Sequence, residues 1–211
     1  MSPPLSRDAA WTLLTEWIAS PGLRRHCLAV AAAMRAMARE QGADEELWEV
    51  TGLLHDLDYE RFPDLETGHP RHAIALLEER GAPPEMVHAI AAHAPYLGVP
   101  AQTPLDRALL AVDELSGFVL ACAYVRPEGI HGMTPKSVKK KLKTPAFAAA
   151  VSREDVARGA ELAGMEFDDL IRLVIAALEG EADALELGHR RPQADGPPPA
   201  AEPAPAAAAP E

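Results

Sequence analysis

Apolar residues recur at helical spacing from the start of the chain. Residues 7–19 form one such run, which Ser6 can cap and which Pro21-Gly22 ends. Residues 23–41 carry a second stripe, which ends at Gly42, a residue suited to a left-handed cap. This second stripe consists of Leu23, His26, Val30, Ala33 and Met37. A histidine therefore lies among the predicted core residues of the second helix.

A third helix is predicted over residues 45–57, with Asp44 as its cap. Because the connection 41–44 is short, the second and third helices are expected to run antiparallel as neighbours. His26 lies about 15 residues before this turn and His55 about 10 after it, or roughly 22 Å and 15 Å at the helical rise. The two histidines are then offset by little more than one helical turn, so a modest crossing angle would bring them together.

The helical pattern continues through most of the remaining chain. Helices are predicted over residues 69–80, 84–94, 104–125, 136–143, 152–164 and 167–187, with a short Ala-rich helix after Pro145. In the helix 104–125 the apolar phase of Leu109, Ser116 and Leu120 places Asp113 on the buried side. A buried carboxylate without a partner is costly, so Asp113 needs a cation or good hydrogen-bond donors. The predicted fold class is all-α, a compact bundle of helices.

Composition narrows the picture further. The chain has 211 residues, of which 48% are hydrophobic and only 5% aromatic, so one domain with an aliphatic core is expected. A formal charge of −12 argues against broad nucleic-acid binding and against anionic membrane surfaces. Cys27 and Cys122 lie in apolar helical contexts and are interpreted as core residues. We find no signal peptide and no apolar run long enough to span a membrane, which favours a cytoplasmic protein.

Ligand-type residues gather at the ends or on the apolar faces of the predicted helices. They are His26, His55, Asp56, His69, His93 and Asp113. Imidazole and carboxylate groups together suit Zn, Mn or Fe. His55 and Asp56 are adjacent in sequence and would diverge by about 100° within a helix, so they are expected to converge where the third helix frays. The residues themselves thus predict a metal centre between helices.

These residues and their surroundings resemble the HD-domain superfamily of metal-dependent phosphohydrolases, in particular its small single-domain bacterial members. The resemblance rests on His26 and on the motifs "LLHDLD", "HPRHAIALLEERG", "AIAAHA" and "ALLAVDELSG", which occur in the family's order. It covers about residues 20–185. It implies an HD domain over residues 1–188. Residues 189–211 are rich in Pro and Ala without periodicity, and we expect them to be a disordered tail.

The resemblance also implies a ligand set and an activity. His26, His55, Asp56 and Asp113 would hold one divalent transition metal (Fe, Mn, Zn, Ni or Co), and His69 and His93, with Asp56 bridging, can hold a second. The expected reaction is hydrolysis of a phosphate ester by metal-activated water, on a nucleotide or another small phosphorylated metabolite. Lys136, Lys139 and Arg126 are the candidates for neutralising phosphate charge.

Several alternatives stay open at the level of sequence. Asp58, Glu60 or Glu114 can orient a water molecule, and His72 can substitute for His69. Tyr59 occupies the position, three after Asp56, where related subfamilies place a Glu or Lys that acts on substrate, so the proton donor is open. The whole chain can also be a nucleotide-binding sensor without turnover, or an HD-type di-iron oxygenase.

A truncation tests the predicted tail. Ending the chain at Gly188 should leave the melting temperature and the activity essentially unchanged, because a Pro/Ala-rich segment without periodicity buries little apolar surface. Thermal unfolding and an activity assay of the two lengths make the comparison. A loss of many degrees on truncation would show instead that the segment packs on the domain.

Overall fold

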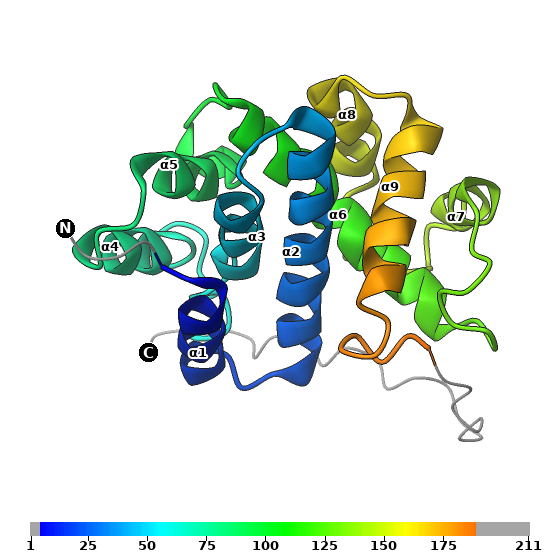
Figure 1. Cartoon of the computed structure of the whole chain (residues 1–211), viewed down its shortest axis with the longest axis horizontal. Coiled ribbons are helices and arrows are strands. Elements are labelled where there is room, and N and C mark those ends of the chain that lie inside the picture. Colours follow the sequence, from blue (N-terminus) through cyan, green and yellow to red (C-terminus); the bar gives the residue numbers. More distant parts are fainter. Residues whose placement is uncertain (1–4, 189–211) are drawn as a thin grey trace, which may run out of the picture.

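The computed structural model describes residues 5–188, and over this range helices are the regular secondary structure, joined by turns and loops (Figure 1). The predicted all-α, compact class is confirmed, whereas the predicted tail 189–211 lies outside the described residues. The elements are α1 (Arg7–Trp17), α2 (Pro21–Gln41), α3 (Glu45–Leu54), α4 (Arg71–Glu79), α5 (Pro84–Ala92), a 3-10 turn (Pro95–Leu97), α6 (Pro104–Tyr124), α7 (Pro135–Leu142), α8 (Arg153–Ala163) and α9 (Phe167–Gly180).

Most predicted helices appear with ends shifted by a few residues, and three predictions need correction. α3 ends at Leu54, before the His55-Asp56 doublet, and α9 ends at Gly180 rather than 187. Residues 145–150 form turns, so the short Ala-rich helix predicted there is wrong. Ala148 has φ 44°, a left-handed conformation that interrupts a right-handed helix.

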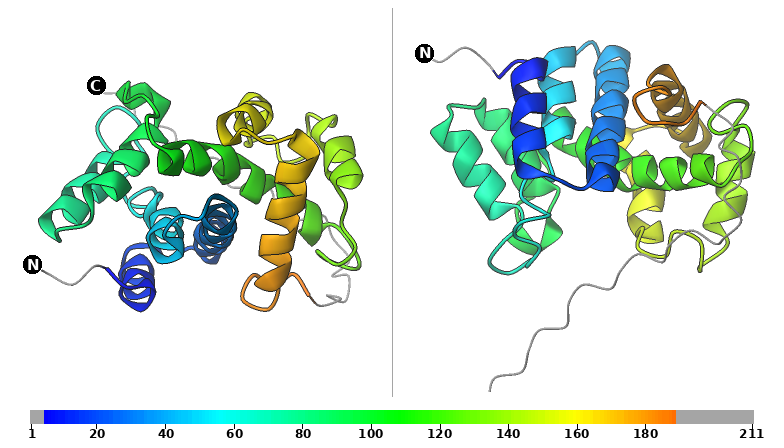
Figure 2. Two further views of the ribbon diagram at one scale, coloured as in Figure 1. Left: turned by 45° about the horizontal axis from the view of Figure 1, so that its top comes forward. Right: turned by 90° about the horizontal axis from the view of Figure 1, so that it is seen from below.

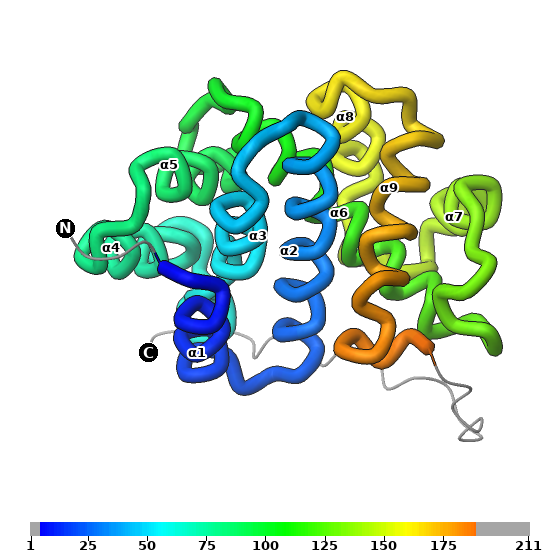
Figure 3. The backbone as a smooth tube through the Cα atoms, viewed as in Figure 1, coloured from blue at the N-terminus to red at the C-terminus, as the bar shows by residue number. Residues whose placement is uncertain are grey.

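α2 and α3 form the antiparallel hairpin that the short connection predicted (Figure 3). The turn between them is built by Gly42, with φ 65°, and by the Asp44 side chain, which accepts a hydrogen bond from the backbone N–H of Leu47. The two helices approach closely at Gly52. A Cβ at this position would lie 2.9 Å from Met34 Cγ and 3.0 Å from both Ala31 Cα and the Val30 carbonyl oxygen. Only glycine lets the helices meet at this distance.

Two clusters of buried apolar side chains flank this hairpin. One joins α2 to α6, α8 and α9, with Phe118 as its largest fully buried side chain, and the other joins α1, α3, α4 and α5 to the opposite side of α2. α6 crosses the α2–α3 pair (Figure 2). Cys27 and Cys122 are both buried, as the pattern predicted. α2, α3, α5 and α6 thus meet where the two clusters adjoin.

The segment between α3 and α4 is tied to the start of the molecule. The Glu60 carboxylate accepts hydrogen bonds from the backbone N–H groups of Ala19 and Ser20, just before α2. Arg61 donates to the carbonyl oxygens of Glu16 and Trp17, and its guanidinium lies 4.7 Å from the Trp17 ring centroid. Glu60, considered above as a water-orienting acid, is therefore engaged in holding this loop in place.

The described helices include none with the length and apolar character that a membrane crossing requires. The cytoplasmic location inferred from the sequence stays a prediction.

The contact at Gly52 gives a stability prediction. Gly52→Ala should lower the free energy of unfolding by about 1–3 kcal/mol, because the added methyl group meets backbone atoms of α2 that cannot move aside cheaply. Gly180→Ala is the matched control: nothing lies within 4 Å of its added Cβ, so stability should stay level or rise slightly. Denaturant unfolding measures both. Equal effects of the two substitutions would contradict the close packing of α2 on α3.

Candidate metal centre

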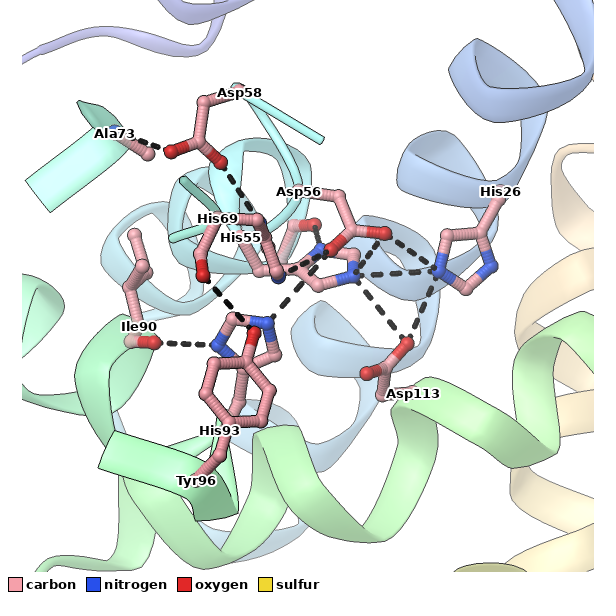
Figure 4. A network of polar contacts seen from close by, with 11 residues as sticks. His26, His55, Asp56, Asp58, His69, Ala73, Ile90, His93, Tyr96 and Asp113 are labelled. Atoms are coloured by element: carbon pink, nitrogen blue, oxygen red, sulfur yellow. Dashed lines mark hydrogen bonds and ion pairs between the residues drawn. The ribbon is translucent and has the colours of Figure 1, made fainter. Parts of the chain in front are cut away.

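Two histidines from neighbouring helices face each other across the α2–α3 interface. His26 lies in the first half of α2, and His55 follows the last residue of α3; their Nε2 atoms are 3.3 Å apart (Figure 4). The His26 ring packs against α6, where a Cβ at Gly117 would come within 3.4 Å of its Nδ1. The approximate alignment expected from the hairpin geometry is therefore realised as direct contact.

Asp113 of α6 closes this group from a third helix. Its Oδ1 lies 3.0 Å from His26 Nε2 and 3.3 Å from His55 Nε2. Asp113 faces inward as its position in the helix predicted, but its side chain is not fully buried and keeps 23% of its surface exposed. The carboxylate thus has both the imidazole partners that a buried acid needs and an open side.

Asp56 stands between two groups of imidazoles. Its Oδ2 lies 3.7 Å from His26 Nε2 and 3.5 Å from His55 Nε2, whereas its Oδ1 lies 3.4 Å from His69 Nε2 and 3.7 Å from His93 Nε2. Because His55 and Asp56 follow the end of α3, the adjacent side chains converge as expected. Two sets of donor atoms, each within 4.8 Å of one another, share Asp56: one includes His26 and His55, the other His69 and His93.

The second group is assembled from two further chain segments. His93 follows the end of α5, and its Nδ1 donates to the Ile90 carbonyl oxygen. His69 precedes α4, which begins at Arg71 rather than at residue 69 as predicted, and its Nδ1 lies 2.8 Å from Asp58 Oδ1. The Tyr96 hydroxyl donates to the His69 carbonyl oxygen at 3.1 Å. The side chains of His69 and His93 are each only 5% exposed.

Charge is redistributed within this centre. Burial alone would lower the pKa of His55, but the carboxylates of Asp56 and Asp113 raise it well above its ordinary value. Burial would conversely raise the pKa of both acids, and His55 lowers both well below their usual range. The carboxylates therefore stabilise a positive charge among the imidazoles. Imidazole nitrogens and carboxylate oxygens arranged around such a position fit a divalent transition metal.

Other candidates near the centre have different surroundings. His72 stacks on Phe62 with ring centroids 3.8 Å apart and does not replace His69 among the inward-facing donors. Glu114 accepts a hydrogen bond from the Ser152 backbone N–H, and burial, followed by the Asp113 charge, raises its pKa. Tyr59 is 43% exposed, with its ring centroid 5.1 Å from that of His69. Tyr59 thus lies beside the centre, in contact with His69 and partly exposed to solvent.

The three basic candidates for phosphate binding lie elsewhere. α7, which carries Lys136 and Lys139, packs on α9 and α6 at the far end of the molecule from α4 (Figure 1). Lys139 Nζ pairs with Asp168 at 2.5 Å. Asp113 lies 11 residues before the end of α6, or about 16 Å along the helix, and Arg126 follows that end and donates to the carbonyl oxygens of Gly129 and His131. The structure does not bring these three side chains to the centre.

Sequence reasoning missed three residues that contribute to the centre. Gly52 and Gly117 occur inside helical patterns, where an isolated glycine can be read only as a weakness of the helix. Tyr96 lies in a segment that the sequence reads as loop. A glycine inside an apolar stripe is a usable hint of close helix packing, but only the partner helix shows which contact it serves.

Comparison with known proteins identifies the family of one part of the chain. The family model of the HD domain matches residues 23–117. This part of the chain is an HD domain. It contains all six predicted ligand residues, and HD domains belong to a superfamily of metal-dependent phosphohydrolases. The boundaries 1–188 predicted for the domain remain a prediction.

The matches to curated relatives cover only a small part of those relatives. The chain is 35% identical to Ribonuclease Y of Oleidesulfovibrio alaskensis over 98 residues, which are 46% of this chain and 18% of that protein. It is 36% identical to Ribonuclease Y of Desulfotalea psychrophila over 93 residues, again 18% of the relative. The chain therefore spans less than a fifth of these relatives. No solved structure matches it significantly.

The raised pKa of His55 predicts how metal affinity of the HD domain depends on pH. A ligating imidazole must be unprotonated, so metal competes with the His55 proton at neutral pH. Affinity should rise about tenfold per pH unit below the raised pKa and level off above it. Calorimetry in buffers of different ionisation enthalpy should detect proton release on binding. His131→Ala, at an exposed histidine paired with Glu179, should keep this behaviour, and an affinity independent of pH would contradict it.

Proposed function

We propose that the HD domain of this chain contains a two-metal centre and hydrolyses a phosphate ester. One observation carries the proposal: the two oxygens of Asp56 face different pairs of imidazoles. The first metal position is formed by His26, His55, Asp56 and Asp113. The second is formed by His69 and His93, with Asp56 shared. A carboxylate placed in this way can bridge two ions.

The donor set defines the class of metal. Imidazoles and carboxylates without thiolate suit Fe, Mn, Zn, Co or Ni, and Cys27, the cysteine close to the centre in sequence, is fully buried with its pKa raised well above the ordinary value. When bound, such ions lower the pKa of water towards neutrality and polarise phosphoryl oxygens. The chain's own residues hold the donors in place: oxygen atoms of Gly52, Asp58 and Ile90 face Nδ1 of His55, His69 and His93 and leave Nε2 of each ring directed inward.

The proposed substrate is a nucleotide or another small phosphorylated metabolite. With a formal charge of −12, the chain needs local positive charge to attract an anion, and Lys136, Lys139 and Arg126 do not lie where they can supply it. The metal ions themselves would then be the main attraction for phosphate. The name of the relatives, Ribonuclease Y, makes an RNA phosphodiester the alternative to be tested.

A reconstitution experiment tests the activity. The chain is stripped of metal, reloaded with Mn, Fe, Co, Ni or Zn under anaerobic conditions, and offered three substrates: nucleoside monophosphates, bis(p-nitrophenyl) phosphate and a short oligoribonucleotide. Metal-dependent phosphate or nitrophenol release is expected with at least one small substrate, and cleavage of the oligoribonucleotide alone would move the function to RNA. Nucleotide binding without turnover would indicate a sensor, and oxygen consumption by the iron form an oxygenase.

Asp113→Asn separates a metal ligand from an ordinary partly buried acid. The substitution keeps the shape but removes the charge, so metal affinity and turnover should each fall by more than about 100-fold. Metal at 100 times its Kd should stabilise the wild type by about 2.7 kcal/mol, a rise of roughly 5–10 °C in midpoint, and the variant far less. Thermal unfolding with and without metal measures this, with His131→Ala as control. Equal shifts in wild type and Asp113→Asn would remove Asp113 from the ligand set.

A further inference from the structure

Asp58 lies behind the second group of donors, with both carboxylate oxygens in use. Its side chain is fully buried; Oδ1 is 2.8 Å from His69 Nδ1, and Oδ2 accepts the backbone N–H of Ala73 at 2.9 Å. Figure 4 shows the carboxylate on the far side of His69 from Asp56. His69 lies between Asp58 and the centre, so Asp58 is not placed to contact a substrate or water there. The sequence had left open that Asp58 orients a water molecule directly.

The contact determines which nitrogen of His69 carries the proton. An ionised carboxylate only accepts hydrogen bonds, so the proton must lie on Nδ1 of His69, which leaves the lone pair on Nε2. That Nε2 faces Asp56 Oδ1 at 3.4 Å. His55 and His93 achieve the same orientation through the carbonyl oxygens of Gly52 and Ile90. Among these three histidines, only His69 depends on a side chain that mutation can change.

We propose that Asp58 is a positioning residue that fixes His69 as an Nε2 ligand and thereby controls occupancy of the second metal position. The first position does not use His69 and should be independent of Asp58. This inference rests on the ligand arrangement of the proposed function, but not on hydrolysis. Carboxylates that orient a ligating imidazole in this way change metal affinity by about 10–100-fold.

The neighbour Ala73 makes the isosteric substitution informative. In Asp58→Asn the single amide oxygen can face either the Ala73 N–H or His69. The buried Ala73 N–H needs an acceptor, so the oxygen turns to it and the NH₂ group faces His69 Nδ1. His69 must then accept at Nδ1 and carry its proton on Nε2, where it blocks coordination. Asparagine should therefore preserve the packing and reverse the tautomer.

The experiment compares Asp58→Asn with Asp58→Ala. Alanine removes the acceptor and leaves His69 free to adopt either tautomer, so a tautomer-fixing role predicts that Asn loses the second ion more completely than Ala. A purely structural role predicts the opposite order, because Asn keeps the volume and the Ala73 hydrogen bond. Titration with Zn²⁺ and with Mn²⁺ should give two bound ions per wild-type chain. In Asp58→Asn the affinity for the second ion should be lowered about 10–100-fold or more. The first ion should bind as in the wild type.

A spectroscopic measurement reports the tautomer of His69 directly. Nitrogen-15 NMR of the histidines in the zinc-loaded wild-type chain should show His69 protonated at Nδ1 and bound through Nε2, and Asp58→Asn should lose this signature while keeping that of His55. A wild-type chain that binds one ion only, a His69 protonated at Nε2, or a milder effect of Asn than of Ala would each overturn the proposal. A chain that binds two ions but hydrolyses nothing would refute the proposed activity and leave the role of Asp58 intact.

Discussion

The close approach of α2 and α3 is the constraint on which the centre depends. His26 and His55 bring their Nε2 atoms to 3.3 Å only because Gly52 has no side chain between the helices. α6 approaches the same place with a second glycine, Gly117, against the His26 ring. Close contacts at these two glycines bring the segments that carry the donor atoms near one another. A larger side chain at either position would separate the imidazole and carboxylate groups that gather here.

The centre also places polar side chains in the apolar interior of the protein. His55 and Asp58 are fully buried, and such groups are costly unless every polar atom has a partner. Each is satisfied here: His55 by the Gly52 carbonyl oxygen and Asp113, Asp58 by His69 and Ala73. The two hydrophobic clusters on either side pack together the helices that carry these groups. Positive charge, on a proton or a metal, balances the carboxylates.

The loops contribute as much as the helices. Asp56, Asp58 and His69 all come from the segment between α3 and α4, which Glu60 and Arg61 anchor to the end of α1 and the start of α2. Donors on a free loop would lose considerable conformational entropy on binding an ion. The contacts of Glu60 and Arg61 near the middle of this segment reduce that freedom. The basic helix α7 takes no part in it, and Lys139 is instead paired at the surface with Asp168.

The sequence by itself determined the fold class, most of the helices and the HD resemblance, because helical periodicity and ordered His/Asp motifs are local properties of the chain. It also placed His26 opposite His55, since a short connection and a fixed rise per residue leave little freedom. Only the tertiary structure decided that Asp58 turns behind His69, that Glu60 anchors a loop and that Arg126 donates to the carbonyl oxygens of Gly129 and His131. These outcomes depend on which distant segment each side chain meets. The sequence around a carboxylate does not show whether its partner is a substrate, an imidazole or a backbone N–H.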